Sequence, residues 1–119
     1  MNRAFVYVCA PRDGFANSRL KNYCRQLYDM GYLPICPHLM FGSFLSEDTP
    51  EERENCHAMA MDVLRRCRVL AVCSNELTED MEKEIFLAKR LGIVTTSLDG
   101  IKKTSLQHAA NEGMDFAGK

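Results

Sequence analysis

The stretch AFVYVCAPRDG at residues 4–14 decides the fold. It begins with a continuous apolar run rich in β-branched and aromatic side chains, which predicts a strand buried on both faces of a parallel sheet. The PRDG cluster at residues 11–14 then indicates a turn. We therefore expect a central parallel strand over residues 4–10 whose carboxyl end opens into a loop.

Three more short apolar runs predict three more strands. They lie at residues 33–36, 68–73 and 93–97. Pro34 places the first of them at an edge of the sheet, because proline cannot donate a hydrogen bond to the ladder. Strands that alternate with helical segments are typical of a parallel sheet with helices on both faces, and right-handed crossovers favour the strand order 2-1-3-4. We expect an α/β fold, a Rossmann-like three-layer sandwich with a sheet of four or five strands.

The helical segments carry start and stop signals. One helix over about residues 17–30 ends at Gly31, and a second begins at Thr49-Pro50, with the threonine as N-cap. Thr78 caps a third helix, which ends at Gly92. Its inward positions are expected to be Met81, Ile85, Ala88 and Leu91.

Residues 37–49, PHLMFGSFLSEDT, show no clear periodicity and predict a long loop that can fold over a site. Its apolar side chains can form a lid, a dimer contact or a small satellite core, and we favour a lid combined with a contact. Thr104 is expected to cap a short final helix that reaches about Asn111, and the remaining tail is expected to fray or to bind a partner. We expect a single domain over residues 1–119, with an ordered core over about 3–112.

The composition narrows the class of protein. The chain has 119 residues, enough for one domain with one core, and a formal net charge of −1. So small a charge gives no electrostatic reason to expect polymeric nucleic acid or an anionic membrane as a partner. No apolar run approaches the ~20 residues that span a bilayer, and the run near the N-terminus is too short for a secretory signal. We therefore expect a cytoplasmic protein.

The cysteines form no C-x-x-C pair. There are six: Cys9, Cys24, Cys36, Cys56, Cys67 and Cys73. Without a secretion signal they are expected to be free thiols that pack as small apolar side chains. Cys36-Pro37-His38 and Cys56-His57 are conceivable metal ligands, but neither spacing matches a chelating motif. We expect structural thiols and no metal.

The sequence lacks the glycine-rich motifs of dinucleotide folds and P-loops, so a site in this fold must work with side chains. In a sheet of this order, ligands bind beyond the carboxyl ends of the strands where the order reverses, here between the first and third strands. Residues 9–14, residues 74–78 and the start of the helix that carries Glu84 are expected to line this crevice. Arg12 and Asp13 can hold a phosphate or a sugar hydroxyl there, or they can form a solvated turn.

Glu84 borders the inward stripe of its helix. Helical side chains lean toward the N-terminus, so its carboxylate is expected to point back toward the crevice. Spacing alone nevertheless favours an exposed acid that pairs with Lys83, Lys89 or Arg90. His38 lies in the long loop, where a histidine is more often a surface residue than an acid–base group.

A set of local segments, taken in order, is the most distinctive feature of the sequence. The set begins with FVYVCAPRDG at 5–14, and its specific parts are PHLMF at 37–41, PEERE at 50–54 and the pattern M-x-x-E-I-x-x-A-x-x-x-G at 81–92. With them the chain resembles the nucleoside 2-deoxyribosyltransferase-like family over most of its length, about residues 5–94, and looks closest to a compact bacterial and phage branch. The resemblance implies a Rossmann-like fold and a retaining transfer of 2-deoxyribose between bases, in which a glutamate attacks the anomeric carbon.

The resemblance also implies roles for individual residues. It makes Glu84 the nucleophile and Tyr7 the residue that orients it, and Asp80 or Glu79 can assist the leaving base. The expected substrate contacts are Ala10, Pro11, Arg12, Asp13, Gly14, His38, Phe41, Ser74, Asn75 and Met81. Arg68 stands where the family commonly has an acid, and it can bind phosphate or lie at the surface.

The partners implied by the resemblance are a small-molecule nucleoside or nucleotide and further copies of the chain. Enzymes of the family complete their sites with residues from a neighbouring subunit, so a homo-oligomer is expected, with no metal and no organic cofactor. The alternative is a non-catalytic module that binds or senses a nucleotide in the same crevice. A plain oligomeric interaction protein is a third possibility, but it leaves the crevice unexplained.

Overall fold

A computed structural model describes residues 3–11 and 17–111, with the side chains up to residue 104. The element order is β1 (Phe5–Cys9), α1 (Asn17–Asp29), β2 (Leu33–Ile35), α2 (Pro37–Phe41), α3 (Pro50–Leu64), β3 (Val69–Val72), α4 (Glu79–Arg90), β4 (Val94–Ser97) and α5 (Leu98–Asn111). The predicted substrate contacts Arg12, Asp13 and Gly14, and the C-terminal tail, lie outside the described residues.

The sheet is parallel and has the order β2-β1-β3-β4, which confirms the predicted α/β fold and strand order. Strand β1 lies inside the sheet, with Tyr7 opposite Ile35 of β2 and opposite Leu70 of β3. Four successive β1 residues, from Val6 to Cys9, are fully buried, as the continuous apolar run predicts. Strand β2 is an edge strand, where Pro34 is tolerated.

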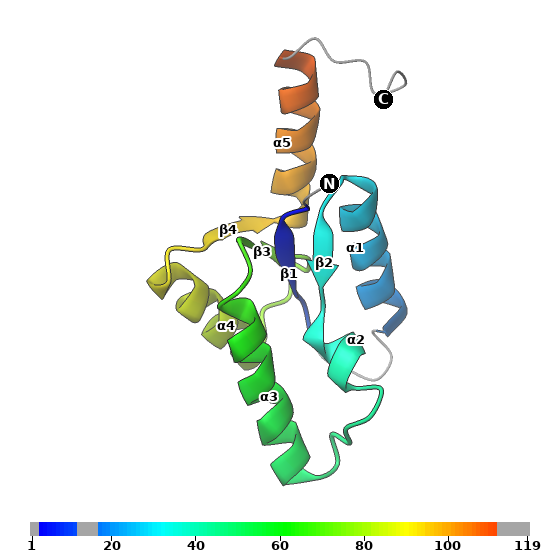
Figure 1. Cartoon of the computed structure of the whole chain (residues 1–119), viewed down its shortest axis with the longest axis vertical. Coiled ribbons are helices and arrows are strands. Elements are labelled where there is room, and N and C mark those ends of the chain that lie inside the picture. The colour runs from blue at the N-terminus through cyan, green and yellow to red at the C-terminus, as the bar shows by residue number, and fades with distance from the viewer. Residues whose placement is uncertain (1–2, 12–16, 112–119) are drawn as a thin grey trace.

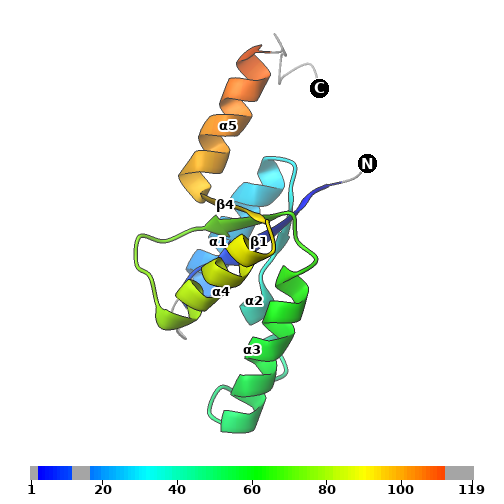
Figure 2. The same cartoon turned by 90° about the vertical axis from the view of Figure 1, so that its left-hand side faces the viewer.

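Helices cover both faces of this sheet, which gives the three predicted layers (Figures 1 and 2). Successive strand residues point to opposite faces, so β1 contributes side chains to two separate cores. Val6, Val8 and Ala10 pack with buried residues of α1 and α5. Tyr7 and Cys9 pack on the other face with buried residues of α3 and α4. Figure 1 shows α1 on one side of the sheet, α3 and α4 on the other, and α5 extending away from the sheet.

The long loop predicted over residues 37–49 is partly helical, because α2 occupies its first five residues. The backbone N–H groups of Leu39 and Met40 both donate to the carbonyl of Cys36 at 3.1 Å, and Pro37 starts the helix. A helix this short presents too little of a 3.6-residue repeat to be read from apolar spacing. The proline at its first turn was the available signal.

The final helix begins at Leu98 rather than at Thr104, so the predicted cap was wrong. The Oγ of Ser97 accepts a hydrogen bond from the N–H of Gly100 at 2.9 Å, while the Thr104 hydroxyl donates to the Gly100 carbonyl inside the helix. Strand β4 therefore runs straight into α5. The first turns of α5 bury Leu98 and Ile101 against the sheet.

Two predictions about helix ends also differ from the structure. Thr49 is the N-cap residue of α3, but its side chain makes no capping hydrogen bond. Leu91, expected to point inward, is 44% exposed because it follows the last residue of α4, where the chain turns through Gly92 with φ +74°. The fully inward positions of α4 are instead Met81, Glu84 and Ala88.

None of the helices in the described ranges combines the length and the apolar character that crossing a membrane requires. All six cysteines are free thiols.

Candidate functional site

The candidate site is built around Glu84, the only charged residue among the buried side chains of the described ranges. Helix α4 packs Met81 and Ala88 against the sheet, and Glu84 lies between them on the same face with 2% of its surface exposed. The hydroxyl of Thr78 fixes the start of this helix by accepting a hydrogen bond from the N–H of Met81 at 3.2 Å. The exposed acid favoured by spacing alone is therefore wrong, and the ion-pair partner of Lys83 is Glu79.

Each oxygen of the Glu84 carboxylate has its own donor from β1. The hydroxyl of Tyr7 donates to Oε2 at 2.7 Å, and the thiol of Cys9 donates to Oε1 at 3.4 Å. Both donors stand on the same face of β1 because they are two residues apart on one strand. Two separate donors on two oxygens hold the plane of the carboxylate as well as its position.

Both donors keep their protons at neutral pH. Burial raises the pKa of the Tyr7 phenol well above its ordinary value, and the Glu84 carboxylate raises it further. Burial, and then the same carboxylate, likewise raise the pKa of the Cys9 thiol. Each group is thus fixed as a hydrogen-bond donor, which a buried carboxylate needs to offset its lost hydration.

His38 approaches the same carboxylate from α2. Its Nε2 lies 3.9 Å from Oε2 of Glu84, and its side chain is only 7% exposed. A protonated imidazole at this place would complement the negative charge of the carboxylate. Three elements distant in sequence, β1, α2 and α4, therefore meet in one polar cluster of Tyr7, Cys9, His38 and Glu84, which we call the Glu84 cluster.

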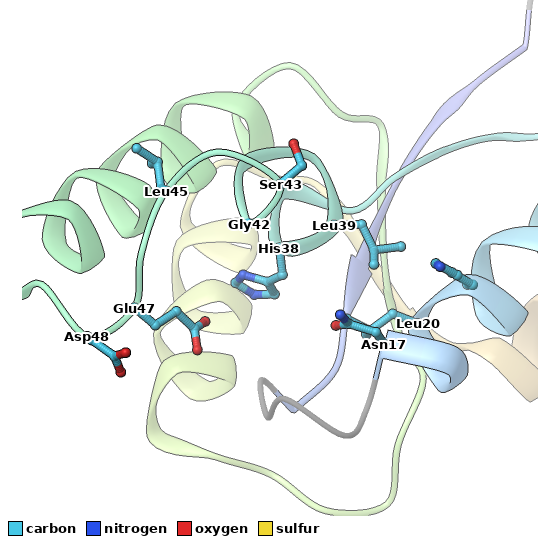
Figure 3. Close-up of a pocket in the computed structure, with 10 residues that line it drawn as sticks. Asn17, Leu20, His38, Leu39, Gly42, Ser43, Leu45, Glu47 and Asp48 are labelled. Atoms are coloured by element: carbon cyan, nitrogen blue, oxygen red, sulfur yellow. The ribbon is translucent and has the colours of Figure 1, made fainter.

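A cavity of about 520 Å³ opens beside this cluster. It is lined by Asn17, Leu20, Lys21, His38, Leu39, Gly42, Ser43, Leu45, Glu47 and Asp48. Figure 3 shows His38 projecting from α2 into this space, with Glu47 on one side and Asn17 and Leu20 on the other. His38 belongs both to the cavity wall and to the Glu84 cluster, so it links the two.

The predicted contacts Ser74 and Asn75 lie elsewhere. They line a second cavity of about 600 Å³, whose other walls come from α1 and from the start of α5. That cavity is on the face of the sheet opposite the Glu84 cluster, because α1 and α5 cover that face. The single crevice expected from the strand order is therefore divided by the sheet.

The other predicted residues of this region lie in different surroundings. Ala10 directly follows β1 and is buried in the core that β1 forms with α1, away from Glu84, and Pro11 is half-buried. Met81 is a core side chain whose backbone carbonyl accepts a weak hydrogen bond from the Cys9 thiol at 3.9 Å. Phe41 packs edge-on against Phe44, with 6.2 Å between ring centroids.

The two acids considered for leaving-group assistance differ in exposure. Asp80 is half-buried in the first turn of α4. Glu79 is exposed and forms its ion pair with Lys83 at 3.8 Å. Arg68 is exposed, and its backbone N–H pairs with the carbonyl of Phe5.

Sequence reasoning missed the role of Cys9. It placed Cys9 at the start of the crevice but interpreted it as a structural thiol, although the period of two along a strand puts it on the same face as Tyr7. It also missed Glu47 and Asp48, which line the cavity but lie in a segment without periodicity. Among the described side chains, no group of three or more histidines, cysteines and acids is placed to hold a metal ion.

Comparisons with known proteins identify the family and similar folds. A family model described as a domain of unknown function (DUF7768) matches residues 4–97. A solved 2-deoxyribosyltransferase from Bacillus psychrosaccharolyticus aligns with a TM-score of 0.65 at 13% identity, over 79% of this chain and 71% of that chain. A 2-desoxiribosyltransferase from Leishmania mexicana aligns with a TM-score of 0.59 at 16% identity, over 79% of this chain and 63% of that chain. At these identities the likeness is one of fold. The comparison with curated proteins found no match.

Proposed function

The chain belongs to the family described as a domain of unknown function (DUF7768), and we propose that it is an N-glycosyl transferase or hydrolase that acts on a nucleoside or nucleotide. The observation that carries the proposal is the Glu84 carboxylate, buried and held by a separate donor on each oxygen. The fold shared with two 2-deoxyribosyltransferases supports the same reaction class.

In the proposed reaction a Glu84 oxygen attacks the anomeric carbon of the sugar. A carbon–oxygen bond forms, the carbon–nitrogen bond breaks, and the base leaves with the electron pair of that bond. An acceptor base or a water molecule then attacks the same carbon and releases the carboxylate. Two displacements on one carbon retain its configuration.

The donors of the cluster assign different tasks to the two oxygens. Oε2 accepts the short hydrogen bond from Tyr7, and Oε1 accepts the longer one from the thiol of Cys9. We assign the attack to Oε1, because a thiol is a weaker donor than a phenol hydroxyl. Tyr7 and Cys9 are then positioning residues, and Glu84 is the nucleophile.

His38 and Asp80 are the groups we assign to the substrate. His38 lines the cavity and stands beside Oε2, so a sugar or base in the cavity reaches His38 first. Reacting atoms must approach to about 3–3.5 Å, and Glu84 is not among the cavity-lining residues, so the His38 side chain has to rotate aside as the substrate enters. Asp80 is better placed than Glu79 to assist the leaving base, because Glu79 is exposed and paired with Lys83.

A second candidate function is a binding module without turnover. The observation that favours it is that Glu84 is only 2% exposed and lies beside His38, which lines the cavity. A carboxylate that no substrate reaches only holds the neighbouring side chains in place. In that case a nucleoside or nucleotide occupies the cavity beside His38 and keeps its N-glycosidic bond.

A base-exchange assay separates the two functions. The protein is incubated with deoxynucleosides or deoxynucleotides and a free acceptor base, and the products are followed by chromatography. Glu84→Gln is expected to lower exchange or hydrolysis by at least about 10³-fold, as loss of a nucleophile does. Glu82→Gln is the matched control, because Glu82 is an exposed acid on the same helix, and it is expected to retain activity.

Two outcomes would overturn the enzyme assignment or its nucleophile. Full activity in Glu84→Gln would remove Glu84 as the nucleophile. If no donor is exchanged or hydrolysed by the wild type while a nucleotide raises its Tm, the protein is a binding module.

A further inference from the structure

The cavity lined by Ser74 and Asn75 lies at the carboxyl ends of two neighbouring strands. Its volume is about 600 Å³, and its wall includes Val72 and Ser97, the last residues of β3 and β4. In open α/β sheets, ligands bind beyond the carboxyl ends of the strands. The proposed function uses only the cavity beside His38, so this second cavity has no role in it.

Part of the wall of this second cavity is apolar. Val72 of β3 and Leu98 of α5 belong to it, and Tyr23 adds an aromatic ring from α1. Leu77 also lines the cavity, although 54% of its surface is exposed. A ligand with an apolar body would cover these side chains and remove apolar surface from water, which favours binding.

Two serine hydroxyls in the wall are oriented by the backbone. The Oγ of Ser74 accepts a hydrogen bond from the N–H of Glu76 at 3.0 Å, and the Oγ of Ser97 accepts one from the N–H of Gly100 at 2.9 Å. A hydroxyl that accepts a hydrogen bond still has its own proton to donate. Both serines can therefore donate to an oxygen atom of a ligand.

Two opposite charges complete the wall. Asp99, which is exposed, and Lys102, which is half-buried, both line the cavity from the first turns of α5. Residues three apart are neighbours on a helix surface, with about 5–6 Å between their Cβ atoms. The ion pairs within the described part of the chain involve neither Asp99 nor Lys102. The cavity therefore presents a cation and an anion side by side.

We propose that this cavity binds a small zwitterion, an α-amino acid with an apolar or aromatic side chain. Lys102 and the hydroxyls of Ser74 and Ser97 bind its carboxylate, Asp99 binds its ammonium group, and the apolar part of the wall covers its side chain. A simple anion would be repelled by Asp99, and a simple cation would be repelled by Lys102. In an α-amino acid both charges are attached to one carbon, which complements two charged side chains that are neighbours on one helix.

The loop that lines this cavity also leads to the start of α4. Leu77 directly precedes Thr78, whose hydroxyl accepts a hydrogen bond from the N–H of Met81 and caps the helix that carries Glu84. A bound amino acid would therefore contact the segment from which α4 begins. Any effect on turnover rests on the proposed function, whereas the binding itself does not.

A single tryptophan can report binding at this place, because the chain contains none. Leu77→Trp puts the reporter on the cavity wall, at a position exposed enough to accept a larger ring. Its emission is expected to change in a saturable way with L-leucine, L-methionine or L-phenylalanine. Phe86→Trp is the matched control, because Phe86 is 63% exposed on α4 and does not line the cavity, and its emission is expected to stay constant.

Analogues of the ligand separate its two charges. Phenylalaninamide lacks the carboxylate and 3-phenylpropionate lacks the ammonium group, so each is expected to bind at least about 10-fold more weakly than L-phenylalanine, since a hydrogen bond to a charged group is lost. Isothermal titration calorimetry of the wild-type protein gives the same affinities without any substitution. It keeps the test valid if the tryptophan itself blocks the cavity.

Charge variants assign each contact. Lys102→Gln and Asp99→Asn are each expected to weaken the binding of L-phenylalanine at least about 10-fold. Lys102→Gln should also remove the preference over phenylalaninamide, and Asp99→Asn the preference over 3-phenylpropionate. Lys103→Gln and Glu76→Gln are the matched controls, because both residues are exposed and neither lines the cavity, and they are expected to bind like the wild type.

Three results would overturn the proposal. They are the absence of binding of all three amino acids to the wild type in calorimetry, equal affinity for L-phenylalanine and its two analogues, and unchanged affinity in both Lys102→Gln and Asp99→Asn. None of these results depends on base exchange at Glu84, so a failure of the proposed function is recognised separately.

Discussion

At the scale of single residues, the structure shows the environment of Glu84. Its carboxylate is buried between Met81 and Ala88, yet each of its oxygens has a donor within hydrogen-bonding distance. A buried carboxylate is costly unless such partners replace its hydration. Tyr7 and Cys9 therefore help to stabilise a carboxylate in this core, independently of any reaction.

The Tyr7→Phe variant should show how much the shorter of these two hydrogen bonds contributes to the free energy of unfolding. The variant keeps the ring in the core but removes the donor to Oε2, and a hydrogen bond to a charged group contributes about 1.5–3 kcal/mol. We expect the free energy of unfolding in urea to fall by about that amount. Tyr28→Phe is the control, because Tyr28 is 50% exposed, and it should change by less than about 0.5 kcal/mol. Equal stabilities of the two variants would contradict this account.

At the scale of elements, both predicted helix starts are correct, but only one of the two threonines caps its helix with its side chain. Thr78 and Thr49 both precede a helix, and the sequence predicts both as N-caps. Only Thr78 accepts a hydrogen bond from its helix, from the N–H of Met81, while the Thr49 side chain makes none. Whether a threonine caps depends on its rotamer and on the path of the preceding chain, which the sequence pattern does not report.

The variants Thr78→Ala and Thr49→Ala measure how much this difference in capping contributes to stability. The loss of the Thr78 cap should lower the free energy of unfolding by about 1 kcal/mol, since one backbone donor of α4 loses its partner. Thr49→Ala should cost clearly less, because no capping bond is lost. Urea denaturation of both variants beside the wild type gives the comparison, and a larger loss for Thr49→Ala would count against it.

At the scale of the whole molecule, burial of ionisable groups ties stability to pH. Burial raises the pKa of Cys67 from its ordinary 9.0 to about 11 and that of Cys73 to about 12, and it raises the pKa of Tyr7 and Cys9 further still. In the unfolded chain these groups lose their protons at their ordinary values, while in the folded protein they keep them. The unfolded state then binds fewer protons, so stability falls as pH rises.

These groups therefore leave the free energy of unfolding unchanged up to about pH 8 and are expected to lower it above pH 9, with each such group contributing up to about 1.4 kcal/mol per pH unit. Cys67 contributes between its ordinary 9.0 and about 11. Chemical denaturation from pH 8 to pH 10.5 measures the slope, and Cys67→Ala should make it shallower. A slope of the opposite sign would refute the assignment of these groups as buried and protonated.

The sequence by itself determined the architecture of this protein. The apolar run at residues 4–10 predicts a strand buried on both faces, and its alternation with helical segments predicts a parallel sheet of the order found, β2-β1-β3-β4. These conclusions follow from local patterns and from chain handedness, which do not depend on the details of packing. The position of Glu84 beside the inward stripe could also be predicted, because helical periodicity is local.

Only the tertiary structure decided which side chains meet. Tyr7, Cys9 and His38 reach Glu84 because β1, α2 and α4 pack against one another. Ser74 and Asn75 line a cavity separate from the one that His38 lines. Such encounters depend on distances between elements remote in sequence, and neither composition nor spacing records those distances.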